Sequence, residues 1–185
     1  MKKKIALLMA CVMAFGIAVG GTLARLTDTT TDVVNTFTSS NISITLTEEK
    51  PANQTAKMVP GYTIVKDPKV TVVANSEACY LFVKITESDN YDNFMTYGIA
   101  DGWTELTTGS GIYWREVAAS EAAQPFYVLD GNKVTVKDTV TKGMMTENFT
   151  QPTLTFKAYA SQLYKNEKND KFTPAEAWAI LNPTT

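Results

Sequence analysis

The sequence predicts an all-β fold, a jelly-roll-like sandwich of two antiparallel sheets with a short C-terminal helix. Threonine, valine, isoleucine and aromatic residues recur in short runs bounded by Asn, Asp, Gly and Pro, which is typical of many short strands. Several of these runs alternate between apolar and polar residues, as half-buried strands do. One segment near the C-terminus carries the start and stop signals of a helix.

The first residues predict a cleavable secretory signal peptide over residues 1–24. Three lysines precede an apolar stretch, Ile5–Val19, and small residues follow up to Ala24. This stretch is shorter than the roughly 18 to 20 residues that span a bilayer, so we expect cleavage between Ala24 and Arg25 and no stable membrane insertion afterwards. Two alternatives are an uncleaved anchor and a lipoprotein with its lipid on Cys11.

The first strands are predicted just after residue 40. Asn41–Leu46 alternates strictly, with Ile and Leu on one face and Ser and Thr on the other. Pro68–Ala74 and Ala78–Thr86 are two apolar runs separated by Asn75–Glu77, a spacing that predicts a tight antiparallel hairpin. Large apolar residues lie on both faces of Ala78–Thr86, which predicts a central strand.

The later strands are predicted at Gly111–Val117, Pro125–Leu129, Lys133–Lys137 and Thr153–Tyr159. Asp130-Gly131-Asn132 lies between the second and the third of these runs, and Asp-Gly is a strong signal for a hairpin. Longer connections are expected at Asp89–Gly111, Lys142–Gln151 and Lys165–Lys171.

The predicted helix begins at Thr173 and runs to about Leu181. Thr173 is a good N-cap, Pro174 is a good first helical residue, and Glu176 completes a capping box. The residues expected to face inward are Ala177, Ile180 and Leu181, with Trp178 on a flank. We expect this helix to plug one end of the sheets.

Length and charge limit the number of domains and the kinds of partner. After residue 24 the chain is long enough for one domain, so we assign 25–38 to an N-terminal strand segment and 39–185 to the β-sandwich. Loss of the three signal-peptide lysines makes the chain more acidic than its full-length net charge of −2, which argues against nucleic acid binding. Cys79 then has no cysteine to pair with, and its apolar surroundings predict a buried side chain.

The sequence contains no histidine, which removes the commonest general base and the commonest transition-metal ligand. We therefore expect no catalytic residues, no metal site and no cofactor. The acidic segment Glu87–Asn93 lacks the spacing of a calcium loop and is expected to be a solvated turn. An alternative is a carbohydrate-binding or glycosidase cleft, formed by Trp103, Tyr113, Trp114, Glu105 and Glu116.

Three parts of the chain carry short motifs, and the order of these motifs along the chain is informative. The first comprises Gly20–Asp28, Asn35–Thr38 and Ile42–Leu46. The second is Met58–Pro68, where Pro-Gly and then Lys-Asp-Pro precede a strand, and the third combines Ala158–Gln162 with Pro174–Trp178. In this order they resemble the TasA/camelysin family of exported proteins from Gram-positive bacteria, although no single piece is specific.

The resemblance implies a jelly-roll subunit of extracellular biofilm matrix fibres, released by a signal peptidase of the SipW type. It implies self-association by donor-strand complementation, in which Arg25–Thr38 completes the sheet of a neighbouring copy. The implied anchors are Leu26, Val33, Val34 and Phe37. An accessory matrix protein is a further partner to consider, and the implied location is the extracellular matrix or the cell surface.

Three alternatives remain open at this point. The segment Arg25–Thr38 can instead pair within its own subunit. The family also carries a metalloprotease label through camelysin, so a secreted metallopeptidase is one alternative function, against which the absence of histidine argues. A monomeric surface-adhesion or carbohydrate-binding module is another.

Overall fold

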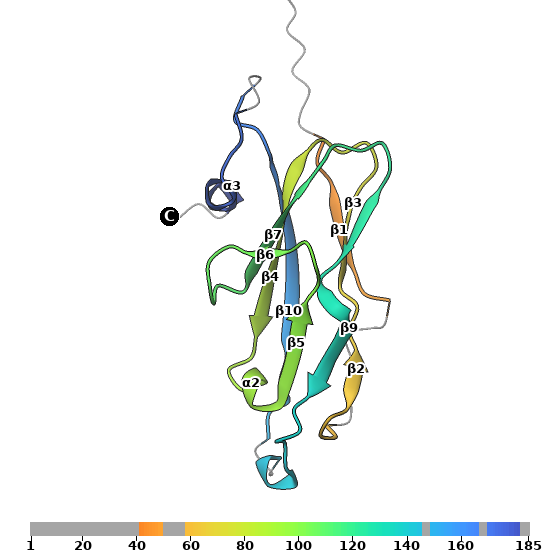
Figure 1. Ribbon diagram of the computed structural model, residues 1–185, viewed down its shortest axis with the longest axis vertical. Helices are drawn as coiled ribbons and strands as arrows, with labels where there is room; N and C mark the ends of the chain where they lie inside the picture. The colour runs from red at the N-terminus through yellow and green to blue at the C-terminus, as the bar shows by residue number, and fades with distance from the viewer. Residues whose placement is uncertain (1–40, 50–57, 146–148, 167–169, 182–185) are drawn as a thin grey trace, which may run out of the picture. The chain divides into compact units, whose positions relative to one another are not determined.

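The structure, a computed structural model, describes residues 41–49, 58–145, 149–166 and 170–181, all within the unit Ser39–Thr185. The predicted signal peptide, 1–24, and the strand segment, 25–38, lie outside the described residues. Antiparallel strands form two packed layers in the described part of the chain, which confirms the predicted all-β sandwich (Figure 1).

The first layer combines two three-stranded sheets, β1-β3-β8 and β2-β9-β5. Its strands are β1 (Ile44–Thr47), β2 (Thr63–Val65), β3 (Lys69–Val72), β5 (Met95–Ile99), β8 (Gln124–Tyr127) and β9 (Leu129–Val136). The sheets are continuous because the Lys66 amide donates to the Asn132 carbonyl at 2.9 Å and the Val128 amide donates to the Pro68 carbonyl at 3.0 Å. The β2–β3 run therefore pairs along its length with the β8–β9 run.

The second layer is one four-stranded sheet of order β10-β4-β7-β6. Its strands are β4 (Cys79–Glu87), β6 (Thr104–Glu105), β7 (Ile112–Val117) and β10 (Leu154–Gln162). Along the sequence the chain alternates between the layers, passing from β3 to β4, β5, β7, β9 and finally β10. This alternation is the pattern of a jelly roll.

Strand β4 is buried on both faces, as predicted for a central strand. Leu81, Val83 and Ile85 face the first layer and belong to the main core. Tyr80 and Phe82 face the other way, into a second cluster beneath the C-terminal helix α3 (Pro174–Leu181). Burial of one such side chain is worth roughly 1.5–3 kcal/mol, so this strand anchors both clusters.

Cys79 begins β4 and is fully buried, which confirms the predicted burial of this side chain. Loss of solvent around the thiol raises the pKa of Cys79 to about 11. The thiol therefore behaves as a small apolar side chain at neutral pH.

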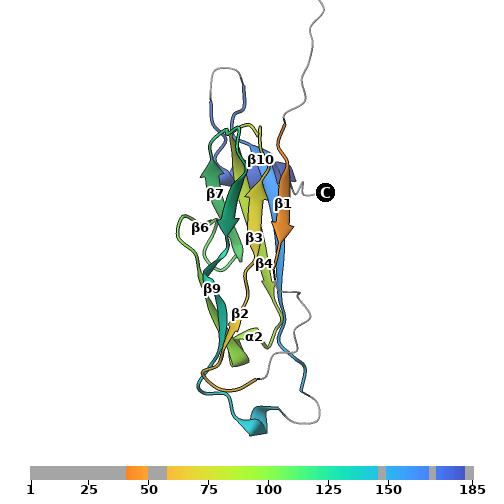
Figure 2. The same cartoon turned by 90° about the vertical axis from the view of Figure 1, so that its right-hand side faces the viewer.

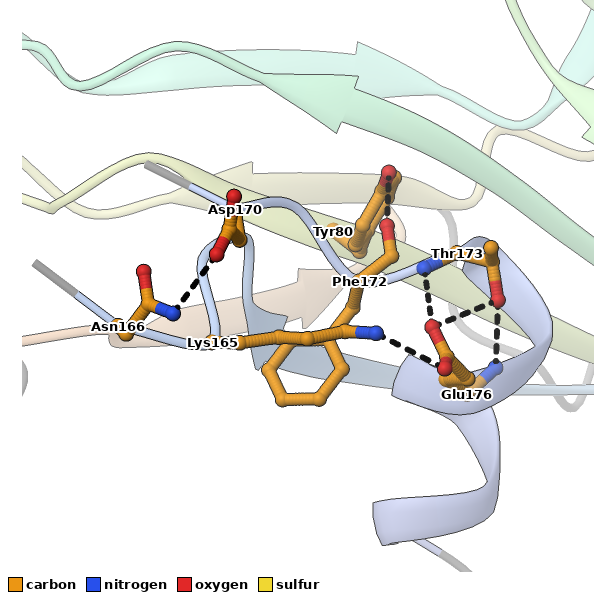
Figure 3. A network of polar contacts seen from close by, with 7 residues as sticks. All are labelled: Tyr80, Lys165, Asn166, Asp170, Phe172, Thr173 and Glu176. Carbon is orange, nitrogen blue, oxygen red and sulfur yellow. Dashed lines mark hydrogen bonds and ion pairs between the residues drawn. The ribbon is translucent and has the colours of Figure 1, made fainter. Parts of the chain in front are cut away.

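The predicted capping box forms at the start of α3. The Thr173 amide and hydroxyl donate to Glu176 Oε2 at 2.8 and 3.0 Å, and the Glu176 amide donates to Thr173 Oγ1 at 3.3 Å (Figure 3). The Thr173 amide bond, together with the bond from Lys165 Nζ to Glu176 Oε1, lowers the pKa of Glu176 to about 2. The helix start is thus fixed by local sequence.

The predicted position of this helix at one end of the sheets is wrong, because α3 lies on the outer face of the second layer, against β10 and β4. Trp178, expected on a flank, packs on Phe82 and Tyr159, with ring centroids 5.3 and 5.0 Å apart. Ile180, expected to face inward, is 54 % exposed. The indole of Trp178 packs on the aromatic rings of the outer face of the sheet, and this orientation of the helix leaves Ile180 exposed to solvent.

The predicted hairpin between Pro68–Ala74 and Ala78–Thr86 is wrong. Strand β3 pairs with β1 and β8, whereas β4 pairs with β10 and β7, so the connection crosses from one layer to the other. Asn75, in the left-handed region with φ 61°, makes the turn, and the Ser120 amide donates to the Ser76 carbonyl at 3.1 Å. The apolar residues of the two strands consequently face each other across the core.

The hairpin predicted at Asp130-Gly131-Asn132 is also wrong, since all three residues lie inside β9. Gly131 and Asn132 have φ angles of 58° and 52°, and the register with β5 shifts between Tyr97 and Ile99. The three residues form an irregularity that bends one continuous run. The same left-handed preference that favours a hairpin turn also favours such a bulge.

Several short elements were not predicted. The segment Asp89–Gly111, expected to be a connection, contains the helical turn α2 (Tyr91–Phe94) as well as β5 and β6. A 3-10 turn, η1, spans Lys142–Met144 within the next connection, and β2 follows Gly61. The elements of two to four residues offer too few residues for a periodic pattern to be recognised, whereas β5 was missed although its five residues alternate.

Candidate functional site

The two layers meet along two long sides, which we call seams. On one side the edge strands β1 and β10 lie next to each other (Figure 2). On the other side, the Phe126 side chain of β8 meets Arg115 of β7, and the indole of Trp103, just before β6, donates to the main chain of β8. We name these sides the β1/β10 seam and the β7/β8 seam.

An open groove of about 400 Å³ lies at the β1/β10 seam. It is lined by Leu46, Thr47, Glu48, Lys66, Leu154, Thr155 and Phe156. Leu46 is 36 % exposed, and Leu154 and Phe156 are half-buried, so apolar surface between the layers still meets solvent here. The groove is therefore a small apolar recess between the two edge strands.

The backbone of β10 is unpaired along its outer edge within the described residues, because β10 pairs only with β4. The Ser88 amide donates to the Thr153 carbonyl at 3.0 Å, which fixes the alternation of hydrogen-bonded pairs in this antiparallel ladder. The residues whose N–H and C=O groups point away from β4 are then Leu154, Phe156, Ala158 and Ala160. Their side chains pack toward the core, so one edge offers both backbone groups and apolar contacts.

Strand β1 has a shorter edge of the same kind. The Val73 amide donates to the Ser43 carbonyl at 2.9 Å, so the main-chain groups of Ile44 and Leu46 point away from β3. Strand β1 belongs to the layer opposite β10, which leaves the position beside β10 vacant among the described residues.

One ion pair lies at the groove. Lys66 Nζ is 2.9 Å from Glu48 Oε2, and the two side chains are only 19 % and 17 % exposed. The same ammonium lies 5.6 Å from the centre of the Phe156 ring. The two opposite charges cancel, so this ion pair adds no net charge to the groove.

The β7/β8 seam is closed by side chains. The Trp103 indole, 9 % exposed, donates from Nε1 to the Tyr127 carbonyl at 2.8 Å. The ladder with β3 turns the main-chain groups of Tyr127 and Pro125 outward, and proline has no N–H to offer. This edge is therefore a poor acceptor for another strand.

Arg115 completes the closure of the β7/β8 seam. Its guanidinium carbon is 4.0 Å from the centre of the Phe126 ring and 5.3 Å from that of Trp103. Desolvation by these neighbours lowers the pKa of Arg115.

The residues considered for a sugar cleft do not share one face, although Glu105 and Tyr113 are cross-strand partners between β6 and β7. Trp114 packs on Tyr80 in the cluster beneath α3, whereas Trp103 belongs to the main core between the layers. Glu105 accepts hydrogen bonds from the amides of Gly109 and Gly111, and Glu116 is paired with Lys171 at 2.6 Å. Each carboxylate is thus engaged in holding a loop or a strand.

The acidic segment Glu87–Asn93 has local partners. Glu87 Oε1 accepts a hydrogen bond of 2.6 Å from the Tyr97 hydroxyl, and Asp92 is paired with Lys137 at 3.9 Å. The hydroxyl of Ser88 donates to Asn90 Oδ1 at 2.7 Å. No group of three or more His, Cys, Asp and Glu side chains that could hold a metal ion occurs in the described part of the chain.

The site residues predicted from the sequence lie outside the described residues, namely Ala24, Arg25, Leu26, Val33, Val34 and Phe37. The sequence did reveal the strand at Thr153–Tyr159, but its period is the same for a paired strand and for an edge strand. Nothing local therefore marked β10 as an unpaired edge. No helix among the described residues is long and apolar enough to cross a membrane.

Comparisons of the chain with family models, with curated proteins and with solved structures found no match.

Proposed function

We propose that this protein is a secreted structural subunit of extracellular matrix fibres, and that each subunit accepts the mature N-terminal strand of a neighbour beside β10. The observation that carries the proposal is that no described strand occupies the position at the β10 edge, next to the groove of the β1/β10 seam. The order of motifs that resembles the TasA/camelysin family supports it independently.

The edge supplies the two kinds of interaction that strand addition needs. Four residues of β10 turn their N–H and C=O groups outward, and each hydrogen bond to an added strand is worth roughly 1 kcal/mol. The groove supplies apolar contacts, and each buried anchor adds roughly 1.5–3 kcal/mol. A short strand can thus bind firmly at this edge.

The donor proposed is Arg25–Thr38, released when a SipW-type signal peptidase cuts between Ala24 and Arg25. Because side chains alternate along a strand, Val33 and Phe37 face one side and Leu26 and Val34 face the other. We assign Val33 and Phe37 to the groove. An uncleaved chain would keep this segment tethered to the membrane, so cleavage would both release the protein and permit assembly.

The test compares two forms of the protein, one beginning at Arg25 and one at Ser39. The longer form should produce fibres visible by electron microscopy, and the shorter form should sediment as a monomer. A synthetic peptide of residues 25–38 should bind the shorter form with 1:1 stoichiometry in calorimetry. A Val33→Asp/Phe37→Asp peptide should lose binding, whereas a Val34→Asp peptide should retain most of it.

The acceptor edge is tested by Ala158→Pro in the shorter form. Proline removes an outward N–H and spares the ladder with β4, so the fold should persist while peptide binding is lost. Ala158→Ser is the matched control, because it changes the side chain and keeps the N–H. Equal peptide binding by both variants would show that β10 is not the acceptor, and fibres from the form beginning at Ser39 would refute the donor assignment.

A further inference from the structure

Arg115 lies at the β7/β8 seam, away from the proposed acceptor edge, and no step of the proposed assembly uses it. It projects from β7 toward the first layer, where its guanidinium lies against the Phe126 ring at 4.0 Å and the Trp103 ring at 5.3 Å. Contacts with aromatic faces hold a guanidinium in one plane and remove water from its faces. The cation is thus fixed in position before any ligand arrives.

This cation has no acceptor among the described residues. Five lysines, Lys66, Lys69, Lys137, Lys165 and Lys171, are each paired with a carboxylate. Arg115 makes neither an ion pair nor a hydrogen bond in the described part of the chain, and its Nε is buried without a partner. A partly desolvated cation without a counter-charge is costly, and an incoming anion would relieve that cost.

The loop that precedes Trp103 places a glycine next to the Nη nitrogens of Arg115. Gly102, exposed and in the left-handed region with φ +83°, precedes Trp103. A Cβ atom at this position would lie 2.9 Å from Arg115 Nη2 and would displace the end of the arginine side chain, and the positive φ by itself favours glycine. The half-buried arginine therefore has its Nη2 group next to a residue without a side chain.

We propose that Arg115 is a binding site for a carboxylate group, held by the Nη1 and Nη2 donors while Phe126 and Trp103 fix the plane of the guanidinium. A carboxylate fits because its two oxygens match the planar fork of an arginine, and one positive charge balances one negative charge. The carboxylate comes either from a small organic acid or from an Asp or Glu side chain of another copy of the chain.

The experiment titrates acetate into the form that begins at Ser39, which stays monomeric under the proposed function, at constant ionic strength with chloride as the exchanged anion. The readouts are the NMR signals of the Arg115 Nε–H and the Trp103 indole N–H. Both should shift in a saturable way with a dissociation constant of about 10 mM, as expected for one charge-assisted pair in water. Arg115→Lys keeps the charge but loses the planar fork, and should reduce the affinity at least about fivefold.

Arg115→Gln should abolish the saturable shift of the indole signal, and near-UV circular dichroism verifies that each variant retains its packed core. A shift that is linear in acetate, equal in chloride, or unchanged in Arg115→Gln would overturn the proposal. Sedimentation then separates the two sources of carboxylate. In the form that begins at Arg25, a higher critical concentration for fibres of Arg115→Gln would indicate an acidic side chain of a second copy, and an unchanged critical concentration together with saturable acetate binding would indicate a small acid.

Discussion

The two seams of the sandwich are built from the same kinds of strand but treat their edges in opposite ways. At the β7/β8 seam, the Trp103 indole donates a hydrogen bond to the outward carbonyl of Tyr127, and Pro125 has no N–H with which to pair. Arg115 packs between the layers against Phe126. At the β1/β10 seam, the start of β10 lines an open groove, and the outward main-chain groups of this strand have no partner among the described residues.

The difference between the seams indicates at which edge a strand of another chain can pair. An exposed edge strand invites association, and proteins that remain monomeric protect such edges with proline, charge or covering side chains. The β7/β8 seam has all three forms of protection, whereas the groove side of β10 has none in the described residues. The contrast leads to four predictions, given from the largest expected effect on stability to the smallest.

Trp103→Ala should destabilise the protein by about 3–5 kcal/mol, because it removes a buried ring and leaves the Tyr127 carbonyl without its donor. Urea unfolding of the form beginning at Ser39 measures the loss. Trp103→Phe, which keeps most of the ring volume, should cost less than the alanine variant. A loss below about 1 kcal/mol for Trp103→Ala would mean that this seam is not sealed by the tryptophan.

Phe156→Ala should cost only about 1–2 kcal/mol in the same assay, because the side chain is half-buried and already meets solvent in the groove. Its effect on assembly should be larger, with few or no fibres from the form beginning at Arg25. Phe126→Ala is the matched control at the other seam and should leave fibre formation intact. Normal fibres from Phe156→Ala would contradict the role of the groove.

The Lys66–Glu48 pair should contribute a coupling energy of about 1 kcal/mol, since it is partly buried yet borders an open groove. A double-mutant cycle of Lys66→Met and Glu48→Gln measures the coupling by urea unfolding. The coupling energy should fall when the salt concentration is raised from about 0.05 to about 0.5 M, because the Debye length then shortens from roughly 14 to roughly 4 Å. A coupling that does not change with salt would place the pair in a drier setting than the groove suggests.

Pro125→Ala should change stability by less than about 0.5 kcal/mol, because residue 125 turns its main chain outward and makes no ladder bond to β3. It should also fail to create a new assembly edge, since Trp103 still occupies the neighbouring carbonyl. Sedimentation of the form beginning at Ser39 should therefore remain that of a monomer. Dimer formation would show that the proline alone protects this seam.

The sequence predicted the fold class, most of the strands and the capped helix correctly. Local signals suffice for these features, because alternation defines a half-buried strand and the Thr173–Glu176 spacing defines a helix start. The doubly buried strand Ala78–Thr86 was also recognisable, since large apolar residues on both of its faces require cover on both sides.

The pairing of strands was predicted less well, and the two wrong hairpins show why. A short connection such as Asn75–Glu77 fits both a hairpin and a crossover between layers, and the choice depends on which strands lie farther along the chain. Asp130-Gly131-Asn132 favours left-handed backbone whether the strand turns back or merely bulges. The β10 edge was not predictable for the same reason. A strand is an edge strand only because no other strand pairs with it, and a local pattern does not show which strands pair.

The sequence by itself determined that this protein is a β-sandwich with a buried lone cysteine in the described domain and a capped C-terminal helix, since each of these follows from periodicity, composition or a local motif. Only the tertiary structure decided which edges remain open. Closure at the β7/β8 seam brings together Trp103, Arg115 and Phe126 from separate parts of the chain. The β10 edge has no partner strand among the described residues because β1 joins the opposite layer. Both depend on contacts between residues far apart in the chain, which local patterns do not encode.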